Sequence, residues 1–162
     1  MSKKGIEIVN LDTEELIRKL NQALSEEWLA YYQYWIGAKV LEGPMRGEVE
    51  KELEVHANQE LNHATMVAGR IIQLDGTPVL NPENWFKLAH CAYEAPEDSY
   101  IKNVLTQNLN GERCALETYN NLLKFTNGKD FATYDMALFI LKEELEHEQE
   151  IEDWLTDLER KK

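Results

Sequence analysis

Four long stretches of the chain repeat apolar residues every three or four positions, the period of a helix with one buried face. Glycine and proline are sparse and fall between these stretches, so they mark helix ends. At the start of the first stretch, Asp12 and Glu15 resemble a capping box. The pattern predicts an all-α protein with helices over residues 12–41, 48–74, 97–125 and 130–158.

The connections predict how these helices are arranged. Gly43-Pro44 and Asn127-Gly128 are tight turns, so they should join two antiparallel hairpins. The connection over residues 75–96 is long enough to run the length of the bundle, roughly 40 Å. Asn81-Pro82 looks like a helix start, which predicts a short extra helix over residues 82–90 within this crossover. We predict one four-helix bundle domain spanning residues 1–162.

Composition limits the partners of such a bundle. A chain of 162 residues with 43% hydrophobic content can bury a core without disulfide bonds. Its formal net charge of -13 repels nucleic acid and anionic membranes and attracts cations, and Lys3 and Lys4 offset little of that charge. The sequence has no apolar run long enough to span a membrane, and residues 1–10 lack the apolar core of a secretory signal peptide. We therefore expect a cytoplasmic protein with no nucleic-acid or membrane partner.

One glutamate interrupts the apolar stripe near the middle of each predicted helix, and on two helices a histidine follows three residues later. A single such glutamate would be read as a surface residue. Four are harder to explain in this way, because each pair lies equally far from the turn of its hairpin, near mid-bundle. The residues are Glu27, Glu60, His63, Glu112, Glu144 and His147.

A cluster of four buried carboxylates needs positive charge. Like charges and burial both raise carboxylate pKa values and oppose ionisation. Two divalent cations would balance the four charges, with neutral His63 and His147 completing the ligand set. Oxygen and imidazole ligands without thiolate favour iron or manganese over structural zinc.

This ordered set resembles the ferritin-like di-iron carboxylate family, whose pattern is one glutamate from each of two helices and Glu-x-x-His from each of the others. Around Leu20-Asn21 and Gln33-Tyr34 the chain is most similar to bacterioferritin and to Dps-like thioferritins. The resemblance implies two iron ions bridged by Glu60 and Glu144. Glu27 with His63 would complete one ion, and Glu112 with His147 the other. Tyr34 matches a site-adjacent tyrosine of the family, and its position is equally typical of a core tyrosine.

Three features of the sequence differ from bacterioferritin and indicate which relatives the chain resembles most. Leu61 stands where bacterioferritin has its haem-ligating methionine, so no haem is expected. The chain ends soon after Trp154-Leu155, without the fifth helix of 24-subunit ferritins, which favours a homo-oligomeric cage of 12 subunits. Cys91 and Cys114 fit the thioferritin cysteine pair, which implies a redox role. Two separate buried thiols are the alternative, and the sequence leaves a disulfide open.

The resemblance implies a ferroxidase mini-ferritin that oxidises Fe(II) with hydrogen peroxide or dioxygen and stores Fe(III), protecting against oxidative stress. One alternative is a rubrerythrin-like peroxidase without storage, although the chain has no CxxC rubredoxin motif. Another is a metal-free structural bundle, which leaves the four carboxylates uncompensated. His56 lies on the same stripe as Glu60, where it could hold a transient iron or be an ordinary hydrogen-bonded core histidine.

Overall fold

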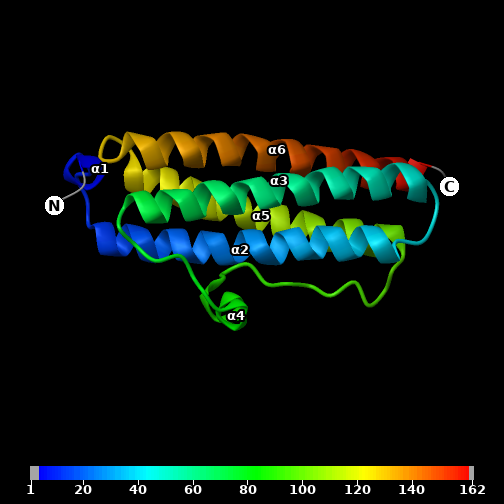
Figure 1. Ribbon diagram of the computed structural model, residues 1–162. Helices are drawn as coiled ribbons and strands as arrows, with labels where there is room; N and C mark the ends of the chain where they lie inside the picture. The colour runs from blue at the N-terminus through cyan, green and yellow to red at the C-terminus, as the bar shows by residue number, and fades with distance from the viewer. Residues whose placement is uncertain (1–3, 161–162) are drawn as a thin grey trace.

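Four long helices lie side by side in the computed structural model, which describes residues 4–160 (Figure 1). The hairpins α2–α3 and α5–α6 are each antiparallel, and α1 and the C-terminal end of α6 lie at opposite ends of the bundle (Figure 1). This arrangement confirms the all-α, four-helix prediction. The long helices are α2 (Thr13–Val40), α3 (Arg46–Gln73), α5 (Ile101–Thr126) and α6 (Phe131–Arg160).

The crossover from α3 to α5 runs along the outside of α2 and carries the short elements η1 (Pro82–Asn84) and α4 (Trp85–Leu88) (Figure 1). Trp85 anchors α4 by stacking on Trp28 of α2, with ring centroids 5.3 Å apart. The predicted helix over residues 82–90 ends two residues early. The reason is local: the backbone amides of His90 and Cys91 donate to the carboxylate of Glu26 instead of continuing the helix.

The predicted start of α5, at residue 97, is also too early. The end of the crossover is instead paired with the α2–α3 turn: Glu42 N donates to Ser99 O at 2.8 Å, and Ile101 N donates to Glu42 O at 2.7 Å. These bonds keep the backbone extended up to Ile101. Gly43 in this turn has a φ of 126°, and a Cβ there would lie 2.9 Å from Ile101, so the position requires glycine.

One further helix, α1 (Lys4–Glu7), was not predicted, because four residues are too few for a helical period to show. Lys4 pairs with Glu7 at the surface of α1. Lys3, the other lysine that the sequence analysis weighed against the net negative charge, lies outside the described residues. Within residues 4–160, no helix is long and apolar enough to cross a membrane.

The core consists of two apolar clusters, one toward each end of the bundle. Leu20, Val67 and Ile140 belong to the first, and Leu53 and Leu105 to the second. The predicted glutamates sit between them. Apolar packing on both sides therefore shields this level of the bundle from water.

A buried arginine fixes the end of α3 to the turn between α5 and α6. Arg70 Nη2 donates to both oxygens of Asp130, at 3.0 and 2.9 Å, and its Nε donates to Thr133 Oγ1 at 2.8 Å. Burial opposes ionisation of Asp130, yet the hydrogen bonds from Thr133 and Arg70 outweigh it and lower the pKa of that carboxyl. The sequence pattern does not single out Arg70, because its partner Asp130 lies beyond the other hairpin's first helix and far away in the chain.

Candidate metal centre

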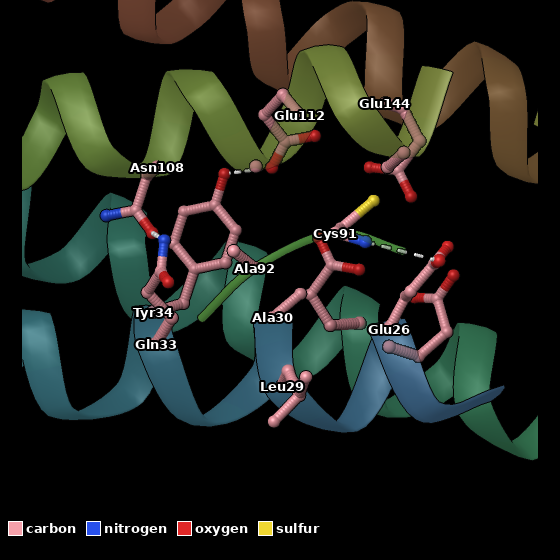
Figure 2. A pocket seen from close by; sticks show the side chains of 14 residues that line it. Glu26, Leu29, Ala30, Gln33, Tyr34, Cys91, Ala92, Asn108, Glu112 and Glu144 are labelled. Carbon is pink, nitrogen blue, oxygen red and sulfur yellow. Dashed lines mark hydrogen bonds between the residues drawn. The ribbon is translucent and has the colours of Figure 1, made fainter. Parts of the chain in front are cut away.

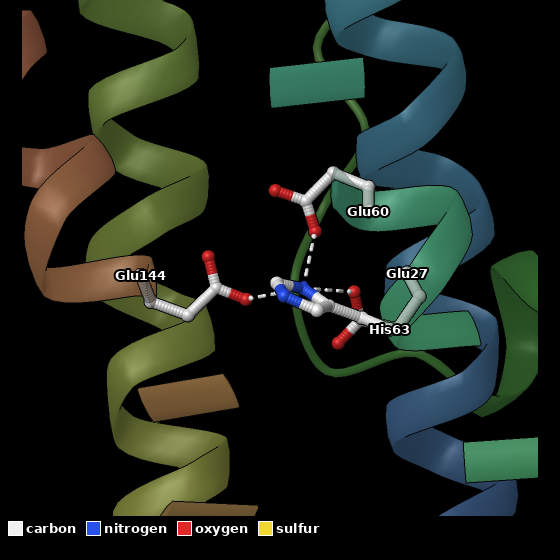
Figure 3. A group of neighbouring side chains, drawn as sticks. All are labelled: Glu27, Glu60, His63 and Glu144. Carbon is white, nitrogen blue, oxygen red and sulfur yellow. Dashed lines mark hydrogen bonds and ion pairs between the residues drawn. The ribbon is translucent and has the colours of Figure 1, made fainter. Parts of the chain in front are cut away.

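The six residues predicted as metal ligands come together at mid-bundle. Each long helix contributes, and every one of the six side chains is 3% exposed or less. Figure 3 shows four of them, with the ring of His63 between the carboxylates of three different helices. Glu27 comes from α2, Glu60 and His63 from α3, Glu112 from α5, and Glu144 and His147 from α6.

Two overlapping groups of ligand atoms form around the two imidazoles. His63 Nδ1 lies 3.4 Å from Glu27, 3.2 Å from Glu60 and 3.3 Å from Glu144. On the other side, His147 Nδ1 lies 3.3 Å from Glu60, 3.6 Å from Glu112 and 3.2 Å from Glu144. Within each group the ligand atoms lie within 4.8 Å of one another, and Glu60 and Glu144 belong to both groups.

The four carboxylates differ in how readily they ionise. Burial, reinforced by neighbouring carboxylates, raises the pKa values of Glu27 and Glu112 well above the usual range. Burial also opposes ionisation of Glu60 and Glu144, but the nearby imidazoles of His63 and His147 outweigh it and lower the pKa values of both carboxyl groups. The two shared carboxylates are thus the ones that stay charged.

Both imidazoles hold their protons strongly. Burial alone would lower the pKa of His63 and His147, but the surrounding carboxylates favour the protonated rings and outweigh it. They raise the pKa of His147 to about 12, and that of His63 is raised as well. Protons can therefore balance the cluster: two on carboxyl groups and two on imidazoles, against two ionised carboxylates.

The chemistry of the cluster fits two divalent cations. Several buried ligand atoms have no hydrogen-bond partner, and such atoms are costly unless they meet a donor or a cation. Two divalent ions would supply the same positive charge as the four protons and would satisfy these atoms. Oxygen and imidazole ligands suit iron or manganese. The unpartnered atoms are Glu27 Oε2, Glu60 Oε1, Glu112 Oε2, both carboxylate oxygens of Glu144, and His147 Nδ1.

The far nitrogen of each imidazole is held by a residue that the sequence analysis did not single out. His63 Nε2 lies 2.7 Å from Glu143 Oε2, and His147 Nε2 lies 3.0 Å from Gln59 Oε1. Such contacts fix ring orientation and direct Nδ1 toward the cluster. The signal was present in the sequence, since Gln59 and Glu143 each immediately precede a glutamate of the cluster.

Two buried tyrosines donate hydrogen bonds to the cluster across the bundle. Tyr34 donates to Glu112, and Tyr119 donates to Glu27. Burial and the adjacent glutamates raise the pKa of both phenols well above the usual range, so both remain donors. Tyr34 was a predicted site residue, whereas Tyr119 was missed. It follows Glu112 by the same seven residues that separate Tyr34 from Glu27, and this repeat could have identified it.

A cavity of ≈ 30 Å³ lies beside the cluster, beneath the crossover (Figure 2). All four glutamates of the cluster line it, together with Cys91 and the buried Glu26. Its volume holds about two water molecules or one small oxidant. Cys91 is joined to Cys114 of α5 by a disulfide with Cα atoms 5.6 Å apart. This disulfide fastens the segment that covers the cavity.

His56 is buried next to the cluster without belonging to either ligand group. Its ring stacks on that of His147, with centroids 4.0 Å apart. Its Nε2 lies 2.7 Å from Glu150 Oε2, and its Nδ1 has no hydrogen-bond partner.

Comparison with known proteins identifies the family. The ferritin-like domain matches residues 17–161, so this chain belongs to the ferritin-like family. It is 52% identical to a solved dodecameric thioferritin, the bacterioferritin-related protein from Bacteroides fragilis, with a TM-score of 0.96 and coverage of 98% of this chain and 96% of that one. These matches confirm the resemblance found in the sequence.

Two further relatives extend the comparison. The DNA protection during starvation protein of Pyrococcus furiosus is 37% identical over 158 residues, covering 96% of this chain and 84% of the relative. The Dps protein of Vibrio cholerae, described as a member of the ferritin-like diiron-carboxylate superfamily, is 16% identical with a TM-score of 0.83, over 88% of this chain and 90% of that one. At that identity the likeness concerns the fold alone.

Proposed function

We propose that this protein is a ferroxidase of the mini-ferritin type, which oxidises Fe(II) with hydrogen peroxide or dioxygen and stores the Fe(III) product. The observation that carries the proposal is the pair of overlapping ligand groups that share Glu60 and Glu144. Each group combines one imidazole with three carboxylates, and all of these residues are buried. Two Fe(II) ions bound there supply the two electrons that reduce one molecule of peroxide to water.

The protein's own residues position these ions and exclude bulk water. Glu60 and Glu144 serve both ions, while Glu27 with His63 and Glu112 with His147 serve one ion each. Tyr34 and Tyr119 restrain the two unshared glutamates through their hydrogen bonds. The cavity under the crossover gives a small oxidant room directly against the carboxylates.

We further propose that the protein assembles into a cage of 12 subunits. The support comes from the Bacteroides thioferritin, which is described as dodecameric and is 52% identical. The net charge of -13 opposes direct binding to DNA, so any protection of DNA would act through removal of Fe(II) and oxidant. The Cys91–Cys114 disulfide has a proposed redox role, because its dithiol form could supply two electrons and two protons beside the cavity.

That disulfide also favours one rival function, a rubrerythrin-like peroxidase that is re-reduced after each turnover and stores nothing. Iron loading separates the two. Under repeated additions of Fe(II) and peroxide, a mini-ferritin should retain far more iron per chain than the two ions of the centre, in assemblies whose mass is measured by light scattering. Retention of two ions per chain with continued peroxide turnover would favour the peroxidase.

A further inference from the structure

A second cluster of possible ligand atoms lies outside the dinuclear centre. Glu52 and His56 of α3 and Glu150 of α6 offer three such atoms within 4.8 Å of one another. His56 Nε2 is 2.7 Å from Glu150 Oε2 and 3.8 Å from Glu52 Oε1. The histidine side chain is 2% exposed, whereas the glutamates are 37% and 48% exposed. In this cluster the imidazole of His56 is buried, and the two carboxylates lie between it and the solvent.

Charge in this cluster is not balanced by the protein. Within residues 4–160, neither Glu52 nor Glu150 forms an ion pair with a lysine or arginine. Two carboxylates thus converge on one imidazole nitrogen, which leaves room for the charge of one divalent cation.

The hydrogen bonding of His56 is also unlike that of an ordinary core histidine. Such a residue normally has partners for both ring nitrogens. Here Nδ1 is buried and has none, and the one close partner of Nε2 is the half-exposed Glu150. A neutral imidazole has two tautomers, so Nε2 of His56 can either donate to Glu150 or present its lone pair to a cation.

The position of the cluster relates it to the dinuclear centre. The ring of His56 stacks on that of His147, and it meets the ring of Tyr34 edge-on at 5.1 Å. The cluster lies between α3 and α6, whereas the cavity beside the centre lies under the α3–α5 crossover, which runs along the outside of α2 (Figures 1 and 2). Cation and oxidant can therefore reach the centre from different sides.

We propose that Glu52, His56 and Glu150 bind one additional divalent cation of the first transition row, which is Fe(II) under physiological conditions. One imidazole nitrogen and two carboxylates are ligands that suit these metals. With fewer ligands and a solvent-exposed rim, this site holds its ion more weakly than the dinuclear centre. It serves as a waiting position from which Fe(II) moves to the centre, and this role rests on the proposed ferroxidase function, whereas cation binding itself does not.

The test uses Co(II) as the probe and three versions of the assembled protein: wild type, the double variant Glu52→Gln, Glu150→Gln, and the control Glu48→Gln. Glu48 is an exposed glutamate on α3, so its replacement removes charge from the same helix without touching the cluster. Anomalous diffraction at the cobalt edge should place one ion at His56 Nε2 in wild type and control. The double variant should lose that ion and keep those of the dinuclear centre.

Kinetics give a second measurement. At limiting Fe(II), the double variant should need a several-fold higher Fe(II) concentration for half-maximal initial oxidation, with an unchanged maximal rate. Wild-type crystals with cobalt only in the dinuclear centre would overturn the inference and leave the proposed function standing. The same holds for a cobalt ion at His56 that persists unchanged in the double variant. Cobalt missing from the dinuclear centre would instead count against the ferroxidase proposal.

Discussion

The two halves of the proposed metal centre have the same arrangement of ligands, but different residues support their imidazoles. The α2–α3 half supplies Glu27 and His63, and the α5–α6 half supplies Glu112 and His147. Each half has a tyrosine seven residues after its first glutamate, and in both cases that tyrosine reaches the opposite half. The halves differ behind the imidazoles, where a carboxylate holds one ring and an amide holds the other.

This difference shows how a near-symmetric bundle can make two unequal sites. A carboxylate behind a metal-binding histidine makes the ring a stronger donor than a neutral amide does. Glu143 therefore strengthens His63, while Gln59 mainly orients His147. We expect the first ion to bind in the Glu27–His63 half. The Glu112–His147 half is also the one next to His56, so the weaker half lies beside the proposed waiting position.

The largest effect should come from removing a residue that both halves share. Glu60→Ala or Glu144→Ala takes a ligand from both ions, so rapid Fe(II) oxidation should fall by more than about a hundredfold, since loss of outer-shell partners alone costs 10–100-fold. Stopped-flow absorbance measures the rate, and circular dichroism should show an unchanged helical fold. Glu146→Ala, at an exposed position of α6, is the control. Wild-type rates in both ligand variants would refute the proposed centre.

The inequality of the halves can be tested by exchanging their supports. Glu143→Gln should weaken binding of the first Co(II) or Zn(II) ion by about tenfold or more, because the ring of His63 becomes a weaker donor. Gln59→Glu should strengthen binding of the second ion and bring the two affinities together. Calorimetric titration of metal-free protein measures both steps. Equal affinities in wild type, unchanged by either substitution, would show that the supports do not set the order.

A third effect concerns the pH dependence of metal-free stability. The folded-state pKa values of Glu27 and Glu112 are raised above their usual 4.5, and those of His63 and His147 above 6.5. The folded protein then binds more protons than the unfolded chain as pH rises from about 5 toward 9, so this stability is lost across that range. The lowered pKa values of Glu60 and Glu144 contribute stability that is fully present at neutral pH and is lost only as pH falls below about 4.5.

Denaturant unfolding of metal-free protein should therefore show a free energy that falls by about 1 kcal/mol or more per pH unit between pH 6 and 9. A variant with all four glutamates of the cluster replaced by glutamine provides the comparison and should show a flatter profile. A wild-type profile that is flat or rises with pH would contradict the protonation pattern described for the cluster.

The smallest effect on the first turnover should come from the cysteines. Cys114→Ser removes the disulfide but no metal ligand, so the first round of Fe(II) oxidation should stay near the wild-type rate. Repeated turnover with peroxide and reductant should change, and in wild type the titratable thiols lost on oxidation should return on reduction. If variant and wild type show the same rate of repeated turnover, the disulfide has only a structural role, which is to hold the crossover against α5.

The fold and the meeting of the six clustered residues were predictable because both depend on helical period and on distance from a turn. Glu27 and Glu60 lie equally far from one turn, and this alone brings them to the same height. Contacts across the bundle follow no such rule. The support of His63 by Glu143 and the pairing of Arg70 with Asp130 depend on how the hairpins dock. The same limit explains the late start of α5, which a bond to Glu42 determines.

The protonation of the cluster couples the binding of metal ions to the release of protons. Loading two divalent ions would displace about four protons, since two carboxyl groups and two imidazoles give them up. Reducing one peroxide to two waters with two electrons consumes two protons. Loading therefore releases about twice as many protons as the reduction of one peroxide consumes, and the surplus passes to the surrounding buffer.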